Sequence, residues 1–261
     1  MYVYNKQLLL PAKENNRHFS GQDSNHLFQK NLECQPADWY YRNHNVEYTW
    51  NSNGYRAPEW DMVDWNNSHI VMGCSYVAGV GLTDSDTLAS RLSTELNEPV
   101  VNLGYGSSGV ATLAYNSLRL IDTGIRPLSV TLVIPNMSRL TMFQDTDTLH
   151  LLPSFFAHNN NHSSFKNMYE TWIGIGPNAE MYSLMLMRGV IANWTNAGVP
   201  LVVKHWMHES HYDWQRLGTC LPSHVDWARD ILNDVHGHPG RKTTQVWASI
   251  IANEIRDATE L

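Results

Sequence analysis

The stretch HIVMGCSYVAGVGL, residues 69–82, starts as an apolar run and ends in a turn that contains glycine. Its first six residues have the apolar character of a strand that is buried on both faces of a sheet. The tripeptide Gly-Cys-Ser then closes the run, which places Ser75 where the strand ends. The stretch therefore predicts the first strand of a sheet with a serine at its carboxyl end.

Apolar runs of the same kind recur along the chain and alternate with amphipathic segments. Three further strands are expected at residues 99–104, 128–136 and 200–206. Helices are expected to begin at Asp84 or Ser85, to run from Val110 to near Gly124 and from Pro177 to near Gly198, to cover Ser223–Leu232, and to include Val246, Ile250, Ile251 and Ile255. Residues 137–176 are predicted to be irregular. The alternation predicts an α/β protein, a three-layer α/β/α flavodoxin-like sandwich with a central parallel sheet.

Residues 1–66 differ from the rest of the chain. They are polar, rich in asparagine and aromatic residues, and lack a continuous apolar face, with turn signals at Asn53-Gly54 and Ala57-Pro58. We expect this segment to be an N-terminal extension that wraps the core. The α/β domain is then expected over residues 67–261, in line with a chain of 261 residues with 43% hydrophobic content.

Composition and charge exclude several classes of protein. The formal net charge is −7 and the 18 Lys and Arg residues are scattered, which argues against a nucleic-acid surface. No apolar stretch approaches the ~18–20 residues needed to span a bilayer, and no secretion signal is evident. The chain has an odd number of cysteines, and their spacing shows no pairing, which favours free thiols. They are Cys34, Cys74 and Cys220. We expect a soluble cytoplasmic protein.

Several strand ends carry residue types that acyl transfer requires. Ser75 follows the first strand, the Gly106-Ser107 turn follows the second, Asn136 ends the third, and His238 precedes the last helix. Ligands of open parallel sheets collect at these carboxyl ends. Ser75 could attack a carbonyl carbon while His238 takes and later returns its proton, with an acidic partner behind the imidazole. Backbone N–H groups of Ser75 and of the turn, with the Asn136 amide, could hold the oxyanion.

These residues resemble the four blocks of the SGNH (GDSL-type) hydrolase family, which supply Ser, Gly, Asn and His in that chain order. The first block is similar to Gly73-Cys74-Ser75, the second to residues 102–107, the third to Asn136, and the last to His238-Pro239-Gly240. The segment NSNGYRAPEW resembles one that precedes the first block in some microbial and phage members. The resemblance implies an esterase that acts on a carboxylic ester, such as an O-acetyl group of a glycan, and that needs no cofactor or metal.

The sequence departs from the family pattern at four points. Cys74 stands where aspartate is usual, Ser107 stands at the second-block glycine position with Gly106 just before it, and Asn136 lacks the usual Gly-x-Asn-Asp context. The family acid usually lies three residues before the histidine, where this chain has valine. Asp234, four residues before His238, is therefore the preferred acid, and Asp230 is its rival.

Other interpretations of the same residues stay open. Ser75 could cap a helix, His238 and Asp234 could lie in a solvated loop, and Asn136 could simply end a strand. In that case the chain is an SGNH-like binding module, which recognises a carbohydrate or a partner protein and has no catalytic turnover. No Gly-x-Ser-x-Gly motif surrounds Ser75, which disfavours the α/β-hydrolase fold.

Two further motifs suggest ligands but match them poorly. Residues 104–109 form a Gly-x-Gly-x-x-Gly between a strand and a helix, yet the next strand ends in Pro135-Asn136 instead of the acid that binds a ribose. His205, His208 and His211, with Glu209 and Asp213 nearby, do not have the spacing of a zinc site. We expect the histidines to line the substrate site or to be structural, and no metal to be bound.

Overall fold

The computed structural model describes residues 8–10, 25–44, 46–143, 148–152, 163–174, 177–206, 217–226 and 237–259. Within this part of the chain, the centre of the molecule is a five-stranded sheet in the order β2-β1-β3-β6-β7. All neighbouring strands are parallel. The strands are β1 (His69–Gly73), β2 (Val100–Gly104), β3 (Ser129–Ile134), β6 (Leu201–His205) and β7 (Thr219–Cys220).

This order is that of flavodoxin-like sheets when the five strands are counted along the chain. The strand order reverses at β1, because β2 was added on one side of it and β3 on the other. The four strands expected from the sequence are confirmed, each within two residues of its expected bounds. The short edge strand β7 was not expected, because two residues are too few to show a period.

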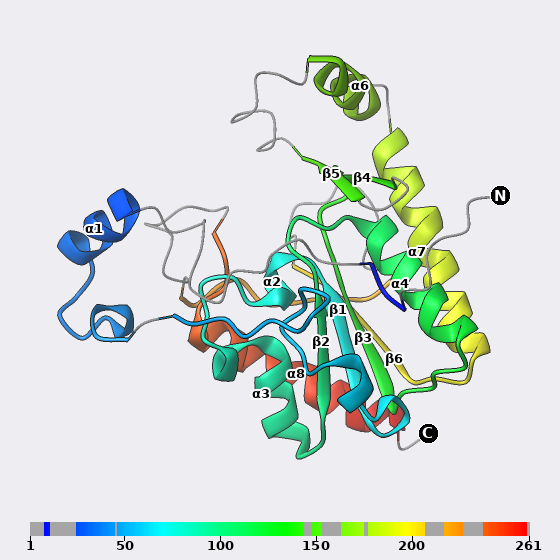
Figure 1. The fold of residues 1–261 in the computed structure, drawn as a ribbon, viewed down its shortest axis with the longest axis horizontal. Helices are drawn as coiled ribbons and strands as arrows, with labels where there is room; N and C mark the ends of the chain where they lie inside the picture. Colours follow the sequence, from blue (N-terminus) through cyan, green and yellow to red (C-terminus); the bar gives the residue numbers. More distant parts are fainter. Residues whose placement is uncertain are drawn as a thin grey trace.

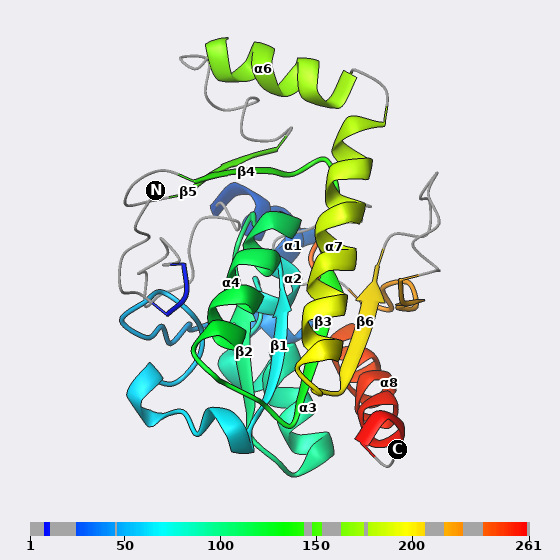
Figure 2. The ribbon, with the colours of Figure 1, turned by 90° about the vertical axis from the view of Figure 1, so that its right-hand side faces the viewer.

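Four long helices cover the two faces of the sheet, as Figures 1 and 2 show. Helices α4 (Val110–Asp122) and α7 (Asn178–Asn196) lie on one face, and α3 (Leu88–Leu96) and α8 (Arg241–Thr259) lie on the other. The alternation of side chains along each strand produces the two cores. Met72 packs in the core of the α4 and α7 face, whereas its neighbour Val71 packs in the core of the α3 and α8 face. The predicted three-layer α/β/α class is confirmed.

The remaining elements are short or lie outside the two layers. The helices are α1 (Asn25–Cys34), α2 (Ser75–Ala78) and α6 (Ser163–Gly174), and the 3-10 turns are η1 (Tyr40–Arg42), η2 (Trp60–Met62), η3 (Trp65–Asn67) and η4 (Asp84–Asp86). The helix expected to begin near Asp84 begins at Leu88, because η4 precedes it and Thr87 caps it, accepting a hydrogen bond from the Ser90 N–H at 3.3 Å. Of the described helices, none has the length and apolar character that a bilayer crossing requires.

The prediction that residues 137–176 are irregular was wrong for much of the segment. An antiparallel hairpin, β4 (Leu140–Phe143) and β5 (Thr148–Leu151), is followed by α6. Figure 2 shows the hairpin and α6 beyond the carboxyl ends of the parallel strands. Leu151 and Tyr169 form a small core of their own there, and the Tyr169 hydroxyl donates to the Ser138 carbonyl at 2.7 Å. Four-residue strands that mix threonine and histidine with leucine carry too weak an alternation to be recognised.

The helix expected over Ser223–Leu232 was wrong in its first four residues, and its remainder lies outside the described residues. Residues 223–226 are not helical. The backbone N–H groups of Val225 and Asp226 donate to the Thr243 hydroxyl, both at 3.0 Å. The Asp226 carboxylate in turn accepts hydrogen bonds from the N–H groups of Lys242 and Thr243, so this segment caps α8.

The segment before β1 makes buried contacts with the α4 face of the sheet. Leu9 and Leu10 lie in the core there, together with Tyr55. Asn116 of α4 joins them, because its side-chain oxygen accepts from the Leu10 N–H at 3.1 Å and its amide donates to the Tyr55 hydroxyl at 3.0 Å. The division of the chain at residue 66 stays a prediction.

Candidate active site

Ser75 is the first residue of α2, directly after β1. Its neighbour Cys74 is the extended N-cap of this one-turn helix, and Ser75 itself is 5% exposed. Glycines make the close approach of α2 to the strand ends possible. A Cβ on Gly73 would overlap the Val77 side chain, and a Cβ on Gly104 would overlap the backbone nitrogen of Ala78. The position of Ser75 is therefore set by backbone packing on the ends of β1 and β2.

The turn after β2 is hydrogen-bonded to the end of β1. The Tyr105 N–H donates to the Gly73 carbonyl at 3.0 Å, and the Ser108 hydroxyl donates to the same oxygen at 3.2 Å. Ser107, inside this turn, has φ of 61°, the left-handed region that favours glycine. The predicted donors at Gly106 and Ser107 thus belong to a turn fixed two residues before Ser75.

Asn136 lies just beyond β3, next to β1 in the sheet. Its side-chain oxygen accepts hydrogen bonds from both the N–H and the hydroxyl of Ser138, each at 2.8 Å. Its carbonyl accepts from the Arg139 N–H at 3.2 Å. Within the described part of the chain, the side-chain nitrogen of Asn136 makes no hydrogen bond. The amide is therefore oriented through its oxygen, and its N–H groups remain as donors.

The segment that carries His238 contacts Tyr76, the residue after Ser75. The Tyr76 hydroxyl donates to the Gly237 carbonyl at 2.7 Å, and the ring centroids of Tyr76 and His238 are 5.4 Å apart in an edge-to-face contact. No hydrogen bond joins Ser75 to His238 among the described residues. The structure thus brings the two segments together, while the Ser75–His238 contact itself stays a prediction.

The structure describes neither of the predicted acids and only part of the histidine cluster. Asp230 and Asp234 lie outside the described residues, as do residues 207–216, which include His208 and His211. His205 is described, and it is buried at the end of β6 with its carbonyl accepting from the Leu221 N–H at 2.7 Å. Among the described residues, no group of three or more His, Cys, Asp or Glu side chains could hold a metal ion.

An aromatic cluster around Tyr76 was not predicted. The ring of Tyr76 lies 4.6 Å from Trp206, 5.5 Å from His224 and 6.2 Å from Trp247, centroid to centroid. Trp206 follows β6, so the rule that ligand sites collect at strand ends could have identified it. His224 and Trp247 come from a loop and from α8, and no sequence pattern links them to Tyr76.

A second hydrogen-bonded set of serine, histidine and carboxylate side chains lies at the opposite end of the sheet. His69 Nδ1 is 2.7 Å from the Ser129 hydroxyl, and His69 Nε2 is 2.6 Å from a Glu98 carboxylate oxygen. Ser129 begins β3 and is 0% exposed. A serine with no solvent access cannot attack a substrate, so we assign these contacts to the packing of β1, β2 and β3.

Two groups beside the His238 segment have shifted pKa values. Burial raises the pKa of the Tyr41 hydroxyl, and the carboxylates of Asp226 and Asp86 raise it further. Burial acts against the charge of Arg241, but the hydrogen bond and attraction to Asp86 outweigh it and raise the pKa of Arg241. Arg241 therefore stays charged and Tyr41 stays neutral at physiological pH.

Comparison with known proteins identifies no family for this chain. No protein-family model matches the chain, and no curated protein matches it. A solved structure of a carbohydrate esterase family 2 enzyme with a carbohydrate-binding domain, from Corynascus thermopiles (Myceliophthora fergusii), is similar with a TM-score of 0.42 and 11% sequence identity. The likeness covers 75% of this chain and 67% of that chain. A likeness of this size does not establish a shared family, and the fold class rests on the sheet itself.

Proposed function

We propose that this chain is a serine ester hydrolase of the SGNH type. Ser75 is the nucleophile and His238 the general base, with Asp234 as the acid behind the imidazole. Gly106 and Asn136 supply the donors for the oxyanion. The substrate is a carboxylic ester, and no metal or organic cofactor takes part.

One observation carries this proposal: potential catalytic groups converge at the carboxyl ends of adjacent strands. Ser75 follows β1, the Gly106-Ser107 turn follows β2, and Asn136 follows β3, and these three strands are neighbours in the sheet. In parallel α/β sheets ligands bind at this end, beside the point where the strand order reverses. The left-handed φ of Ser107 supports the match to the second block, because the serine adopts a backbone conformation suited to the family's glycine.

The chemistry follows from these positions. The Ser75 oxygen attacks the ester carbonyl carbon while His238 accepts the hydroxyl proton. The carbonyl oxygen gains negative charge, which the backbone N–H groups of the β2 turn and the Asn136 amide stabilise. The C–O bond to the alcohol breaks as His238 protonates the alcohol oxygen. Water then repeats the attack on the acyl-Ser75 intermediate, releasing the acid and restoring the serine.

We further propose that the alcohol part of the ester belongs to a glycan. Trp206 is only partly buried, and its ring packs against the buried ring of Tyr76, next to the segment that carries Ser75. Aromatic rings offer flat apolar faces together with a polar tip, which suits contact with a sugar ring. An O-acetyl group on such a sugar would be small enough for a serine that is largely buried.

The test compares two serines of the same chain. Purified wild-type protein is assayed with a nitrophenyl acetate and with an acetylated oligosaccharide, alongside Ser75→Ala and Ser129→Ala. We expect hydrolysis by the wild type and by Ser129→Ala, and loss of at least about 10³ in rate for Ser75→Ala, since the nucleophile is removed. Equal rates for the wild type and Ser75→Ala would refute the proposal.

A second candidate function is a binding module that lacks turnover. The serine at the second-block glycine position and the unusual spacing between the acid and His238 favour it. Such a module would bind an acetylated oligosaccharide with unchanged affinity in Ser75→Ala and would release no acetate. Calorimetric titration of both proteins with the same oligosaccharide, followed by acetate detection, separates the two functions.

A further inference from the structure

Asp86 is a buried carboxylate that joins two different helices. It belongs to η4, on the loop that follows α2, and its side chain is 3% exposed. One oxygen pairs with the guanidinium of Arg91 on α3. The other accepts from Nε of Arg241 on α8 at 2.6 Å and from the Thr83 hydroxyl at 3.0 Å. A charge buried this deeply is stable only while it is paired, so Asp86 fixes its partners as firmly as they fix it.

Arg241 connects this carboxylate to the His238 segment. It lies three residues after His238 and is the first residue of α8. Its guanidinium carbon lies 3.7 Å from the centre of the Tyr40 ring, so the side chain is held between a carboxylate and an aromatic face. The backbone between His238 and Arg241 is conformationally restricted. Pro239 fixes its own φ angle, and the Gly240 N–H donates to the Asp226 carbonyl at 3.1 Å.

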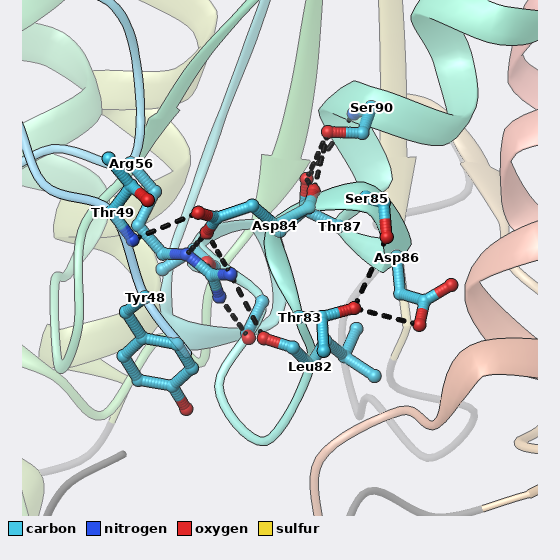
Figure 3. Close-up of polar contacts among 12 residues, drawn as sticks. Tyr48, Thr49, Arg56, Leu82, Thr83, Asp84, Ser85, Asp86, Thr87 and Ser90 are labelled. Carbon is cyan, nitrogen blue, oxygen red and sulfur yellow. Dashed lines mark hydrogen bonds and ion pairs between the residues drawn. The ribbon is translucent and has the colours of Figure 1, made fainter. Parts of the chain in front are cut away.

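The loop that carries Asp86 follows directly after α2, the short helix that begins with Ser75. Residues 79–82 form a tight turn directly after α2, with Gly79 and Gly81 at positive φ. Figure 3 shows Arg56 reaching into this turn beside Asp84. The Arg56 guanidinium donates to the carbonyls of Gly79 at 2.6 Å and Leu82 at 2.9 Å, and its Nε donates to Asp84 at 2.9 Å. The loop is therefore a rigid connection between α2 and η4.

We propose that Asp86 and Arg241 are positioning residues that set the distance between His238 and Ser75. The inference rests on the proposed function for its catalytic meaning. Tyr76 holds the His238 segment from one side through the Gly237 carbonyl, and Asp86 holds it from the other through Arg241. These two attachments lie on either side of His238 along the chain, and together with the hydrogen bond from Gly240 to Asp226 they fix the place of the imidazole.

Arg91 provides a matched control. It pairs with the other oxygen of the same carboxylate but belongs to α3, a different element from the one that carries His238. Arg91→Gln and Arg241→Gln each leave Asp86 with one arginine and Thr83, so their effects on folding should be similar. Of these two variants, only Arg241→Gln removes the link between the His238 segment and Asp86. Asp86→Asn tests the same link if Arg241→Gln does not fold, the double variant Asp86→Asn/Arg241→Gln completes the set, and Arg241→Lys, which keeps the charge, is the conservative rescue.

The experiment uses two readouts on the full chain. The first is kcat and KM for the ester, and the second is the imidazole resonance of His238 in histidine-labelled protein, assigned with His238→Gln. We expect Arg241→Gln to lower kcat about tenfold or more with little change in KM, because displacing a catalytic group costs rate more than binding. The resonance should shift or broaden in Arg241→Gln and stay unchanged in Arg91→Gln. The double variant should be no slower than the slower single variant.

The outcomes separate the two proposals. Wild-type kcat and an unchanged His238 resonance in Arg241→Gln would overturn the inference, as would equal effects of Arg91→Gln on both readouts. If the wild type has no esterase activity, the proposed function fails. The His238 resonance then still decides whether Asp86 and Arg241 fix that side chain.

Discussion

Asn136 shows how one side chain can be oriented by half of its polar atoms and leave the other half for a substrate. Its oxygen is held by Ser138, and its amide is the proposed oxyanion donor. Asn136→Asp keeps the oxygen that Ser138 binds and removes the donor. We expect kcat to fall by roughly 10²–10³ with a small change in KM, measured by steady-state hydrolysis.

Ser138→Ala is the control for this variant. It removes one of the two hydrogen bonds to the Asn136 oxygen and keeps the backbone N–H bond at 2.8 Å. Its kcat should stay within about threefold of the wild type, since the donor itself is intact. Hydrolysis by Asn136→Asp at the wild-type rate would remove Asn136 from the oxyanion site.

Two buried tyrosines make stability fall at alkaline pH. Burial raises the pKa of Tyr41 and of Tyr55 above the ordinary value of 10.0, although a hydrogen bond from Asn116 opposes the shift at Tyr55. The unfolded chain then loses these protons at lower pH than the folded chain does. Their contribution is complete below about pH 10 and is lost as the pH rises above it. Denaturant unfolding at pH 8 and pH 11 should show this loss, and it should be smaller in Tyr41→Phe and Tyr55→Phe.

At neutral pH the same two variants should differ. The Tyr41 hydroxyl has no hydrogen-bond partner among the described residues, so its removal should be neutral or slightly stabilising. Tyr55→Phe leaves the buried Asn116 amide without its acceptor and should cost about 1–2 kcal/mol. Equal stability of the two variants would contradict this assignment of their environments.

At the residue scale, the sequence predicts positions better than contacts. Ser75, Asn136 and the Gly106 turn could be predicted because each follows an apolar run whose end is visible in the sequence. The left-handed φ of Ser107 could not, since serine usually avoids that region and only the surrounding turn imposes it. The contacts of Tyr76 with Gly237 and His238 join residues about 160 positions apart, and no local pattern encodes such a pairing.

At the scale of elements, the packing of α2 on the sheet depends on glycine. The backbone of Ala78 occupies the space that a Cβ on Gly104 would need. Gly104→Ala should therefore displace α2, lower the free energy of unfolding by about 1–3 kcal/mol and reduce kcat, because Ser75 moves with the helix. Thermal unfolding and ester hydrolysis measure the two effects.

Gly189 is the matched control, since it lies exposed within α7 with no atom within 4 Å of an added Cβ. Gly189→Ala should raise stability by roughly 0.5–1 kcal/mol through helix propensity and leave hydrolysis unchanged. If Gly104→Ala proved as harmless as Gly189→Ala, the close contact between α2 and β2 would be refuted.

The parallel strands β1, β2, β3 and β6 and most of the long helices were predicted, whereas the twelve-residue helix α6 and the shortest elements were not. The helices α4, α7 and α8 each run for more than ten residues, so their apolar faces repeat several times. The one-turn helix α2, the strand β7 and the hairpin β4-β5 are two to four residues per element. Their structure is decided by tertiary contacts, and so the sequence alone does not reveal it.

At the scale of the whole molecule, Arg56 connects the N-terminal part of the chain to the loop behind the nucleophile. Its side chain is buried and donates to three backbone carbonyls and to Asp84. Arg56→Gln leaves several of these acceptors unsatisfied and should cost about 3 kcal/mol or more in unfolding experiments. Asp84→Asn retains an acceptor for Arg56, so it should cost clearly less. A loss of under 1 kcal/mol for Arg56→Gln would show that this attachment does not hold the loop.

The central claim joins two distant parts of the chain into one reactive site. A fluorophosphonate reacts with a serine only when a neighbouring base activates it, so the site of labelling in the folded protein tests the claim directly. Peptide mapping by mass spectrometry should find the adduct on Ser75, absent from His238→Gln and present in Ser129→Ala. Folded wild-type protein that takes up no label, or that takes it up at a serine other than Ser75, would contradict the account.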